Sequence, residues 1–318
     1  MTLRSALTAA AIAVASPGIA DVDTALDQHV LPTMDKLAQT TQTLAETPCA
    51  PEDLRPAFRE AALAWAAASH LSLGPAEEDG RAKAILFWPD DRNSTGRGIR
   101  LLAQQGEEAW TPEAIQRASV AGRGLGALER LIWERDAVPC ALTLALADDL
   151  AGTATAIRDG WSKGFADLMR DPGGPGNTRF LTEQESEAAL YTALLTDMEH
   201  AADQRLGRPM GTFDDPRPAR AELGRSGLSM EMVRAALSSL RDLAVTLADA
   251  PETKASLDRA VEMARDLPDH ALQNTDDVQT RFEVEALQTA IRTARDTASA
   301  EIGGALGVPM GFNSADGD

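Results

Sequence analysis

Residues 111–135 read TPEAIQRASVAGRGLGALERLIWER, and the rest of the chain is arranged around this stretch. Thr111 is a favourable N-cap, and Pro112 suits the first position of a helix, where its missing N–H would be unpaired anyway. Apolar side chains then recur every three or four residues, the spacing of one buried helical face. They are Ile115, Ala118, Ala121, Leu125, Leu128 and Ile132. The stretch therefore predicts one amphipathic helix that packs against other helices.

Three glycines inside this predicted helix need a reason, because each costs about 1 kcal/mol relative to alanine. They are Gly122, Gly124 and Gly126. One interpretation is the close approach of another helix or a loop. The other is that the missing side chains leave room for a ligand beside Glu129, which shares a helical stripe with Gly122, Gly126 and Trp133. From this stripe we expect Glu129 to point into the protein, where its carboxylate needs a partner, with Arg225 the first candidate and Arg97 the second. Both interpretations remain open at this point.

The composition indicates an all-α protein. Aromatic residues make up only 4% of the chain, and long stretches have the helical period, with almost no alternating runs of β-branched residues. Helices are predicted at about 23–46, 51–71, 138–169, 229–248, 252–267 and 275–302, with another that begins at Thr182. Residues 74–98 and 207–227 are predicted to be long irregular segments, and DPGGPGN at 171–177 is the strongest break. We therefore predict two halves that resemble four-helix bundles, residues 21–170 and 171–318.

Residues 1–20 have the pattern of a cleavable signal peptide. Arg4 gives a positive start, residues 6–15 form a short apolar run, and residues 18–20 end in small side chains. No cysteine lies at the junction, which argues against a lipid anchor. The pattern therefore predicts export of a mature chain that begins near Asp21.

The only two cysteines are Cys49 and Cys140. An even number of cysteines in an exported chain favours one disulfide. A metal-binding or catalytic thiol is the alternative, but it has no CxxC spacing and no neighbouring histidine to support it. We therefore expect a bridge that ties the loop before the second helix to the helix after Trp133.

The formal net charge of −19 bears on which partners the protein could bind. A chain this acidic repels nucleic acid and anionic membranes, so neither is an expected partner. Metal cations would be attracted, although solubility alone also explains an excess of acidic residues. The four histidines are scattered, and no HExxH or GxSxG motif is present, so no catalytic residues are assigned.

Residues 124–133, GLGALERLIW, resemble the signature region of the imelysin family, whose motif is GxHxxE. Gly124 and Glu129 match the ends of this motif, whereas Gly126 replaces its histidine. The segments around Trp88-Pro89 and Arg225-Ser226 also resemble regions of imelysin-like proteins. The resemblance covers nearly the whole mature chain.

This resemblance implies an all-helical periplasmic protein associated with iron acquisition, with its site between the two halves. The expected function is binding without catalysis; a metallopeptidase of the imelysin type is the alternative. The cofactor is left open between iron, another divalent metal and none, and Glu129 is a weak candidate metal ligand. The expected partners are a metal ion or small ligand and the periplasmic or outer-membrane components of iron uptake. Candidate ligand-binding residues are Glu129, Gly126, Trp88, Arg225, Ser226, Arg97 and Arg123.

Overall fold

The computed structural model describes residues 21–134 and 140–306, and within them the protein is all-α, as predicted. An isolated bridge between Thr212 and Asp215 is the only β-type pairing in these ranges. The predicted signal peptide, residues 1–20, lies outside the described residues. The predicted export therefore stays a prediction.

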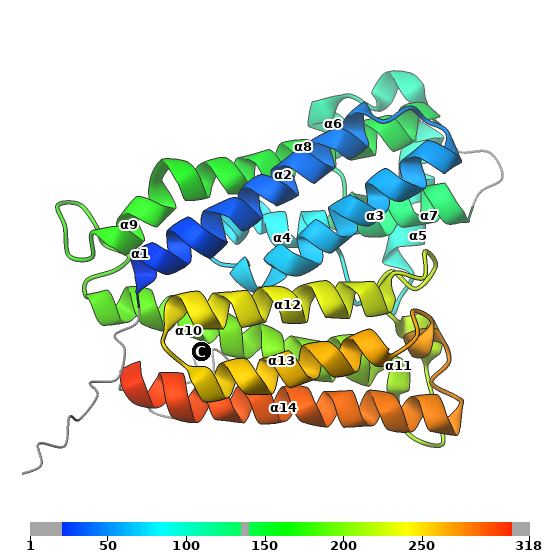
Figure 1. Ribbon diagram of the computed structural model, residues 1–318. Coiled ribbons are helices and arrows are strands. Elements are labelled where there is room, and N and C mark those ends of the chain that lie inside the picture. The colour runs from blue at the N-terminus through cyan, green and yellow to red at the C-terminus, as the bar shows by residue number, and fades with distance from the viewer. Residues whose placement is uncertain (1–20, 135–139, 307–318) are drawn as a thin grey trace, which may run out of the picture.

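Helices of the N-terminal half form the upper layer of Figure 1. A short helix and a π-helical turn lead into a long helix, and the next helix runs antiparallel to it. The helix that follows the signature region, Cys140–Gly160, continues through a second π-helical turn, Trp161–Phe165, into a short helix, Ala166–Arg170. The bounds are Val22–Ala25 (α1), Leu31–Glu46 (α2), Pro51–Ala68 (α3), Cys140–Gly160 (α8) and Ala166–Arg170 (α9).

The lower layer of Figure 1 holds the helices of the C-terminal half. Their bounds are Glu183–Glu199 (α10), Gly207–Met210 (α11), Ser229–Leu247 (α12), Pro251–Asp266 (α13) and Val278–Leu306 (α14). The long helices begin and end within a few residues of their predicted positions. Thr182 caps α10 as predicted, since its hydroxyl accepts a hydrogen bond from the N–H of Glu185 at 3.3 Å.

The prediction of one helix over residues 111–135 is wrong. The segment forms Pro112–Arg117 (α6), a 3₁₀ turn at Val120–Gly122 and Gly124–Trp133 (α7). Gly124 has a φ of +66°, and a Cβ there would lie 2.1 Å from the carbonyl oxygen of Ala84. Only glycine tolerates this positive φ and this close contact with the carbonyl of Ala84, so the chain turns at Gly124, where α7 begins.

Residues 74–98, predicted to be irregular, contain two short 3₁₀ turns, Arg81–Ile85 (α4) and the start of Ser94–Gln105 (α5). The segment that joins α4 to α5 has a cis peptide bond between Trp88 and Pro89. Helix α5 crosses the 3₁₀ turn at its glycines: a Cβ on Gly98 would lie 2.6 Å from the Cα of Gly122. Two of the three glycines in residues 111–135, Gly122 and Gly124, thus serve close packing.

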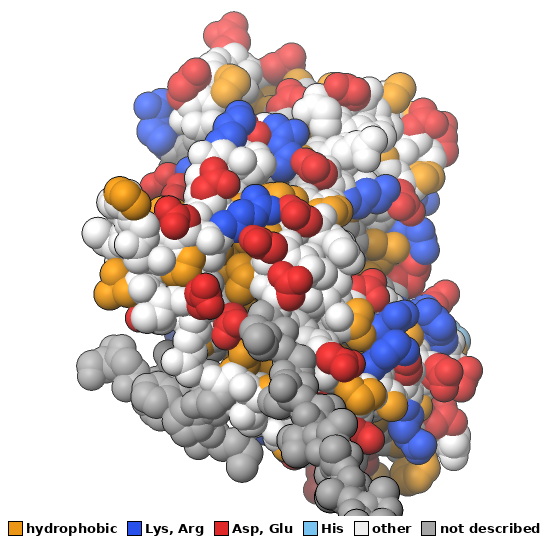
Figure 2. Space-filling model, turned by 60° about the vertical axis from the view of Figure 1, so that its left-hand side comes forward, with side chains coloured by type: hydrophobic (Ala, Val, Ile, Leu, Met, Phe, Trp, Pro, Cys, Tyr) orange, Lys and Arg blue, Asp and Glu red, His pale blue; other side chains and the backbone are white. Residues whose placement is uncertain are grey.

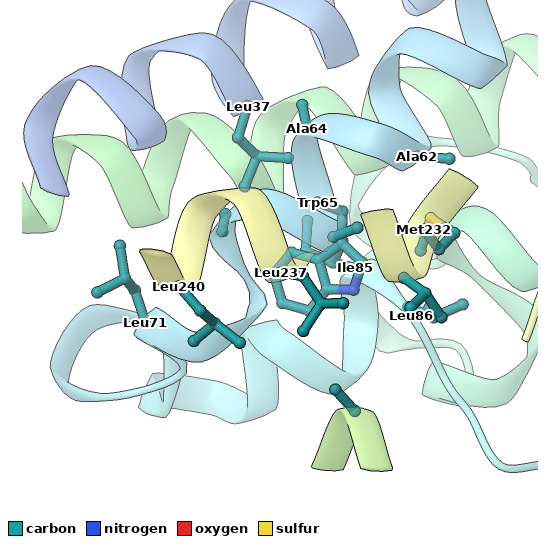
Figure 3. Packing of buried hydrophobic residues seen from close by; sticks show 14 of the residues in the cluster. Leu37, Ala62, Ala64, Trp65, Leu71, Ile85, Leu86, Met232, Leu237 and Leu240 are labelled. Carbon is teal, nitrogen blue, oxygen red and sulfur yellow. The ribbon is translucent and has the colours of Figure 1, made fainter. Parts of the chain in front are cut away.

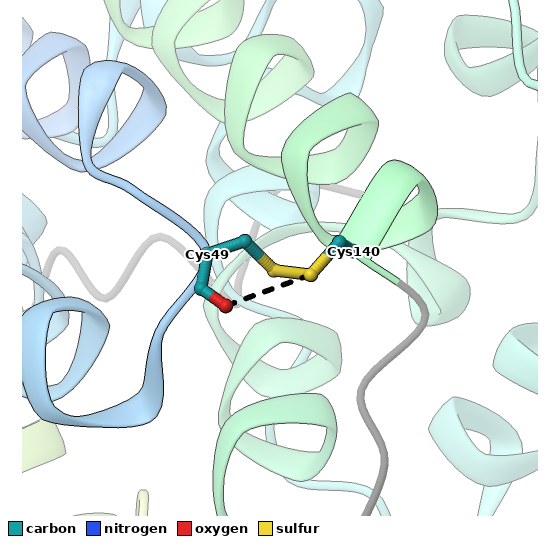
Figure 4. The surroundings of a disulfide bond; sticks show 2 residues. All are labelled: Cys49 and Cys140. Carbon is teal, nitrogen blue, oxygen red and sulfur yellow. Dashed lines mark hydrogen bonds between the residues drawn. A yellow bond between two sulfur atoms is a disulfide. The ribbon is translucent and has the colours of Figure 1, made fainter.

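Cys49 and Cys140 form the predicted disulfide, with their Cα atoms 5.7 Å apart (Figure 4). The bridge ties the turn between α2 and α3 to the first residue of α8. It spans 91 residues of sequence. In the chain-entropy model, closing a loop of that length stabilises the fold by about 4 kcal/mol.

One hydrophobic core runs through both layers. Helix α12 packs against α3, and Figure 3 shows Leu237 and Leu240 of α12 beside Trp65 and Leu71. The predicted boundary at residues 171–177 falls in the loop between α9 and α10, while the core continues across it. The division into two domains therefore stays a prediction.

Helix α8 and its continuation, Cys140–Arg170, are long and apolar enough to cross a membrane, but 50% of the relevant window is buried inside the protein. A central core helix has the same character, and α8 packs on α2 and α7. Figure 2 shows acidic and basic side chains scattered among uncharged surface on the face drawn there. The excess negative charge is thus spread over this face.

Candidate functional site

Glu129 on α7 points into the protein, as its helical stripe predicted. Its relative exposure is 3%. The Oε1 atom accepts two hydrogen bonds from Ser226, one from the backbone N–H and one from the hydroxyl, both at 2.8 Å. The expected ion pair with Arg225 is not formed, because Arg225 bonds to Glu134 instead. The neighbouring serine thus satisfies the buried carboxylate.

In the loop that carries Ser226, one residue on each side of the serine has a positive φ, Leu223 at +46° and Gly227 at +77°. This turn brings the N–H of Ser226 toward α7. The hydroxyl of Ser226 lies 2.9 Å from the carbonyl oxygen of Leu223 and 2.8 Å from Glu129. A hydroxyl has one proton, so it can donate to only one of them at a time.

Burial raises the pKa of Glu129 above its ordinary value, because charge is disfavoured away from water. The two hydrogen bonds from Ser226 and the positive charge of Arg225 oppose this effect without cancelling it. Protonation would also let Glu129 donate to Ser226, whose own proton would then bond Leu223. The geometry therefore accommodates both charge states of Glu129.

A cavity of about 180 Å³ adjoins this carboxylate. Three segments far apart in the sequence line it: residues 86–95, α7, and residues 219–225. Gly126 opens onto it, since a Cβ there would meet only the Leu86 side chain and the Phe87 carbonyl, each at 3.8 Å. Gly126 thus fits the second interpretation of the glycines, room for a ligand beside Glu129.

Three arginines and three carboxylates line the cavity: Arg130, Arg220, Arg225, Asp90, Asp91 and Glu129. Asp90 caps α5, accepting hydrogen bonds from the N–H groups of Ser94 and Thr95 at 2.7 and 2.9 Å. Asp91 accepts hydrogen bonds from Arg208 at 2.6 and 2.7 Å. Arg220 lies 3.8 Å from Asp91, with 41% of its side chain exposed. The carboxylates are thus engaged with protein groups, whereas the guanidinium of Arg220 is held loosely.

The structure brings five of the seven candidate residues together. Gly126, Trp88, Arg225 and Glu129 line the cavity, and Ser226 bonds to Glu129. Two candidates lie elsewhere. Arg97 is exposed on α5, where it donates to the Ser94 hydroxyl at 2.9 Å. Arg123 forms a buried two-pronged ion pair with Asp149 at 2.7 and 2.8 Å, which joins the start of α7 to α8.

A metal ion does not fit the residues present. The described parts of the chain contain no group of three or more His, Cys, Asp and Glu side chains able to hold one. Position 126 has no imidazole, and the Oε1 atom of Glu129 already accepts two hydrogen bonds from Ser226. Metal sites in proteins ordinarily need three or four converging ligands. Glu129 is thus a poor candidate metal ligand.

Sequence reasoning missed Asp90, Asp91, Arg130 and Arg220 as parts of this site. Arg130 directly follows Glu129, but one step along a helix turns a side chain by about 100°, so its place on the cavity wall needed the tertiary structure. Asp90 and Arg220 belong to the two segments predicted to be irregular, 74–98 and 207–227. The only signal in the sequence was that these residues lie in irregular segments. That the two segments meet over α7 is seen only in the structure.

Comparison with known proteins identifies the fold. The chain matches the family Imelysin, peptidase family M75, over residues 24–298. An imelysin-like protein from Psychrobacter arcticum 273-4 has 18% identity and a TM-score of 0.78, covering 94% of this chain and 100% of its own. An iron-regulated protein A precursor from Parabacteroides distasonis ATCC 8503 has 11% identity and a TM-score of 0.70, with coverages of 88% and 93%. No curated protein gives a significant match. The family match, which spans most of the chain, shows that this protein belongs to the imelysin family.

Proposed function

We propose that this protein is a non-catalytic, periplasmic binding protein of iron acquisition, which holds a small carboxylate-bearing ligand in the cavity beside Glu129. The observation that carries the proposal is the wall of this cavity. Arg130, Arg220 and Arg225 line it, while Glu129 is engaged by Ser226. Guanidinium groups suit carboxylates, which they bind through paired hydrogen bonds.

The link to iron rests on likeness. The Parabacteroides protein of the same fold is described as iron-regulated, and carboxylate-bearing molecules chelate ferric ion readily. A ligand of this class could carry iron without any direct bond between the metal and the protein. The signal-peptide pattern of residues 1–20 supports a periplasmic location.

Isothermal titration calorimetry with citrate and with ferric citrate tests the proposal, with zinc chloride as the bare metal. We expect wild-type protein to bind one citrate, free or as its ferric complex, per chain. Arg220→Ala should weaken this binding about tenfold or more, because a charge-assisted hydrogen bond is lost. Arg259→Ala is the matched control, since Arg259 is exposed on α13, outside the cavity lining, and should leave binding unchanged.

Two results would contradict the proposal. One is stoichiometric zinc binding that Glu129→Gln abolishes, together with no response to citrate. The other is chelator-sensitive cleavage of an unfolded substrate by homogeneous protein, which would support the metallopeptidase.

Gly126→His restores the family motif and provides a complementary test. The space around position 126 admits a side chain, and residues 126 and 129 lie on one face of α7. We expect this variant to gain weak zinc binding that the double variant Gly126→His/Glu129→Gln lacks. Equal zinc binding by wild type and Gly126→His would show that the glycine does not set the ligand preference.

A further inference from the structure

A second and larger cavity, of about 450 Å³, lies between the two layers of helices. It is bounded by the end of α3, the segment before Trp88, helix α10 with its π-helical end, and Glu222. Leu86 and Trp88 belong to both cavities, so their segment is the wall between them. The size falls within the range of pockets that hold small organic molecules, roughly 300–1,000 Å³.

The polar end of this cavity is built around Arg205, a buried arginine on the π-helical end of α10. Its Nε donates to Glu222 at 2.8 Å, Nη1 to Asp197 at 3.3 Å, and Nη2 to the Ser69 hydroxyl at 2.9 Å. Burial alone would lower the pKa of Arg205, but the two carboxylates outweigh burial and raise it. The guanidinium is therefore a fixed positive charge between two acidic side chains.

The charges at this end do not cancel. Asp197 and Glu222 are set against Arg205 alone, and both are nearly inaccessible to solvent. Burial lowers the pKa of His70 to about 3, and burial also lowers that of His200, so these two cavity-lining histidines add no positive charge at neutral pH. Glu77 and Lys83 also line the cavity, and these two exposed side chains balance one another in charge. The lining thus keeps one uncompensated negative charge, at the buried end where unpaired charge is costly.

Asp197 is the less well satisfied of the two carboxylates. Its Oδ2 atom is 3.3 Å from Arg205, and both of its oxygens are 3.5 Å from the Ser69 hydroxyl. Charge-assisted hydrogen bonds are ordinarily 2.7–2.9 Å long, as the bond from Arg205 to Glu222 is. On the same wall, the Nδ1 atom of His70 is buried with no hydrogen-bond partner in the described residues. Acceptor capacity therefore remains at Asp197.

The other walls of the cavity are largely apolar. They include Trp65, Trp88, Leu73 and Leu86, together with two alanines of α10. Aromatic rings beside a carboxylate suit an organic cation, because the ring faces attract positive charge and the apolar body is removed from water. An anionic ligand would instead meet two carboxylates.

We infer that this second cavity is a binding site for an organic amine, a molecule with an apolar body and a primary ammonium or guanidinium head that donates to Asp197. The apolar body packs on the apolar walls, which include Trp65 and Trp88. This site is separate from the arginine-lined cavity beside Glu129, and its ligand has the opposite charge. The inference therefore does not rest on the function proposed above.

Three small probes of one shape and different charge test the inference by calorimetry and by thermal shift. They are 2-phenylethylamine, 2-phenylethanol and 3-phenylpropionate. We expect the amine to bind at one per chain and to raise the melting temperature, with the alcohol about tenfold weaker or worse and the carboxylate not bound. The tenfold step corresponds to loss of one charge-assisted hydrogen bond.

Variants locate the binding. Asp197→Asn should abolish the preference for the amine over the alcohol. Because this change also touches Arg205, Ala193→Leu provides a second test: it fills the cavity from α10 without altering a charge and should abolish amine binding. Ala188→Leu makes the same substitution on α10 at a residue outside the cavity lining, and it should bind the amine as wild type does.

The inference fails if none of the three probes binds, or if 3-phenylpropionate binds as tightly as the amine. It also fails if Ala193→Leu binds the amine as well as Ala188→Leu does. Binding that Arg220→Ala abolishes and Ala193→Leu retains would place the amine in the other cavity and likewise overturn it.

Discussion

At the scale of single residues, Glu129 shows how a helix can carry a buried acid at moderate cost. Ser226 supplies two hydrogen bonds to one oxygen, and its own hydroxyl can turn to Leu223 when the acid is protonated. Burial still raises the pKa of Glu129, so the charged form is a net cost to the folded state. This side chain lines the cavity between α7 and the loop that carries Ser226.

Replacing Glu129 separates its charge from its shape. Because its folded pKa is raised, the folded state holds the proton more tightly, and stability falls as pH rises above the ordinary value of 4.5. Glu129→Gln keeps an oxygen for Ser226 and removes the buried charge, so at pH 7.5 its melting temperature should equal or exceed that of wild type. Glu129→Ala leaves the N–H of Ser226 without an acceptor and should lose about 1–3 kcal/mol. Thermal unfolding measures the first change and urea unfolding the second, and equal destabilisation by the two variants would contradict this account.

The sequence predicted that Glu129 turns inward and that the segment around Arg225 meets it. It did not predict which of two adjacent residues would make the contact, because loop dihedrals such as the positive φ of Leu223 decide that. The His29 and His70 side chains, 2.9 Å apart at their Nε2 atoms, are separated by 41 residues. No spacing rule detects such a pair.

At the scale of elements, uninterrupted periodicity was reliable. The long helices α12, α13 and α14 begin and end within a few residues of their predicted positions, since their apolar stripes continue without a break. The predicted helix over 111–135 is interrupted between α6 and α7, where Ala118 and Arg123 have extended backbones, and Gly124 fits its positive φ against the carbonyl of Ala84. That contact is tertiary, and local sequence alone could not predict it.

The buried ion pair between Arg123 and Asp149 joins the start of α7 to α8. Burial raises the pKa of Asp149, although the hydrogen bonds and charge of Arg123 oppose this. Arg123→Met should cost about 3–5 kcal/mol, because it leaves a buried carboxylate unpaired. The double variant Arg123→Met/Asp149→Leu should recover much of that loss. Lys254→Ala, which removes one partner of the exposed pair with Asp258, is the control and should cost less than about 1 kcal/mol.

Chemical denaturation followed by circular dichroism gives these energies. A loss of citrate binding by Arg123→Met without a loss of stability would instead return Arg123 to the ligand site. That outcome would contradict the structural role assigned to it here.

At the scale of the whole molecule, the two layers are held by buried polar contacts as well as by the apolar core. Arg205 on α10 bonds to Ser69 beside α3 and to Glu222 before α12, so it ties three parts of the interface together. The hydroxyl of Ser239 on α12 donates to the carbonyl of Ala67 on α3 at 2.6 Å. Buried polar bonds of this kind are costly to break one at a time, so the two layers should unfold together.

The pair formed by His29 and His70 makes this assembly sensitive to acid. Burial, with smaller contributions from His70 and from Arg205 respectively, lowers the pKa of each histidine from 6.5 to about 3. The unfolded chain therefore binds up to two more protons than the folded protein below pH 6.5, and stability falls as pH drops toward 3. The carboxylates with lowered pKa values, such as Asp90, add their own loss only near and below pH 4.

Between pH 7.5 and pH 5.5 the histidine pair alone should remove about 2–3 kcal/mol of unfolding free energy. Urea titrations at the two pH values measure this, and His29→Gln, which keeps a partner for His70, should lose only about half as much. His270→Gln changes an exposed histidine and should match wild type. Equal losses of stability in wild type and His29→Gln between the two pH values would contradict the role given to the buried pair.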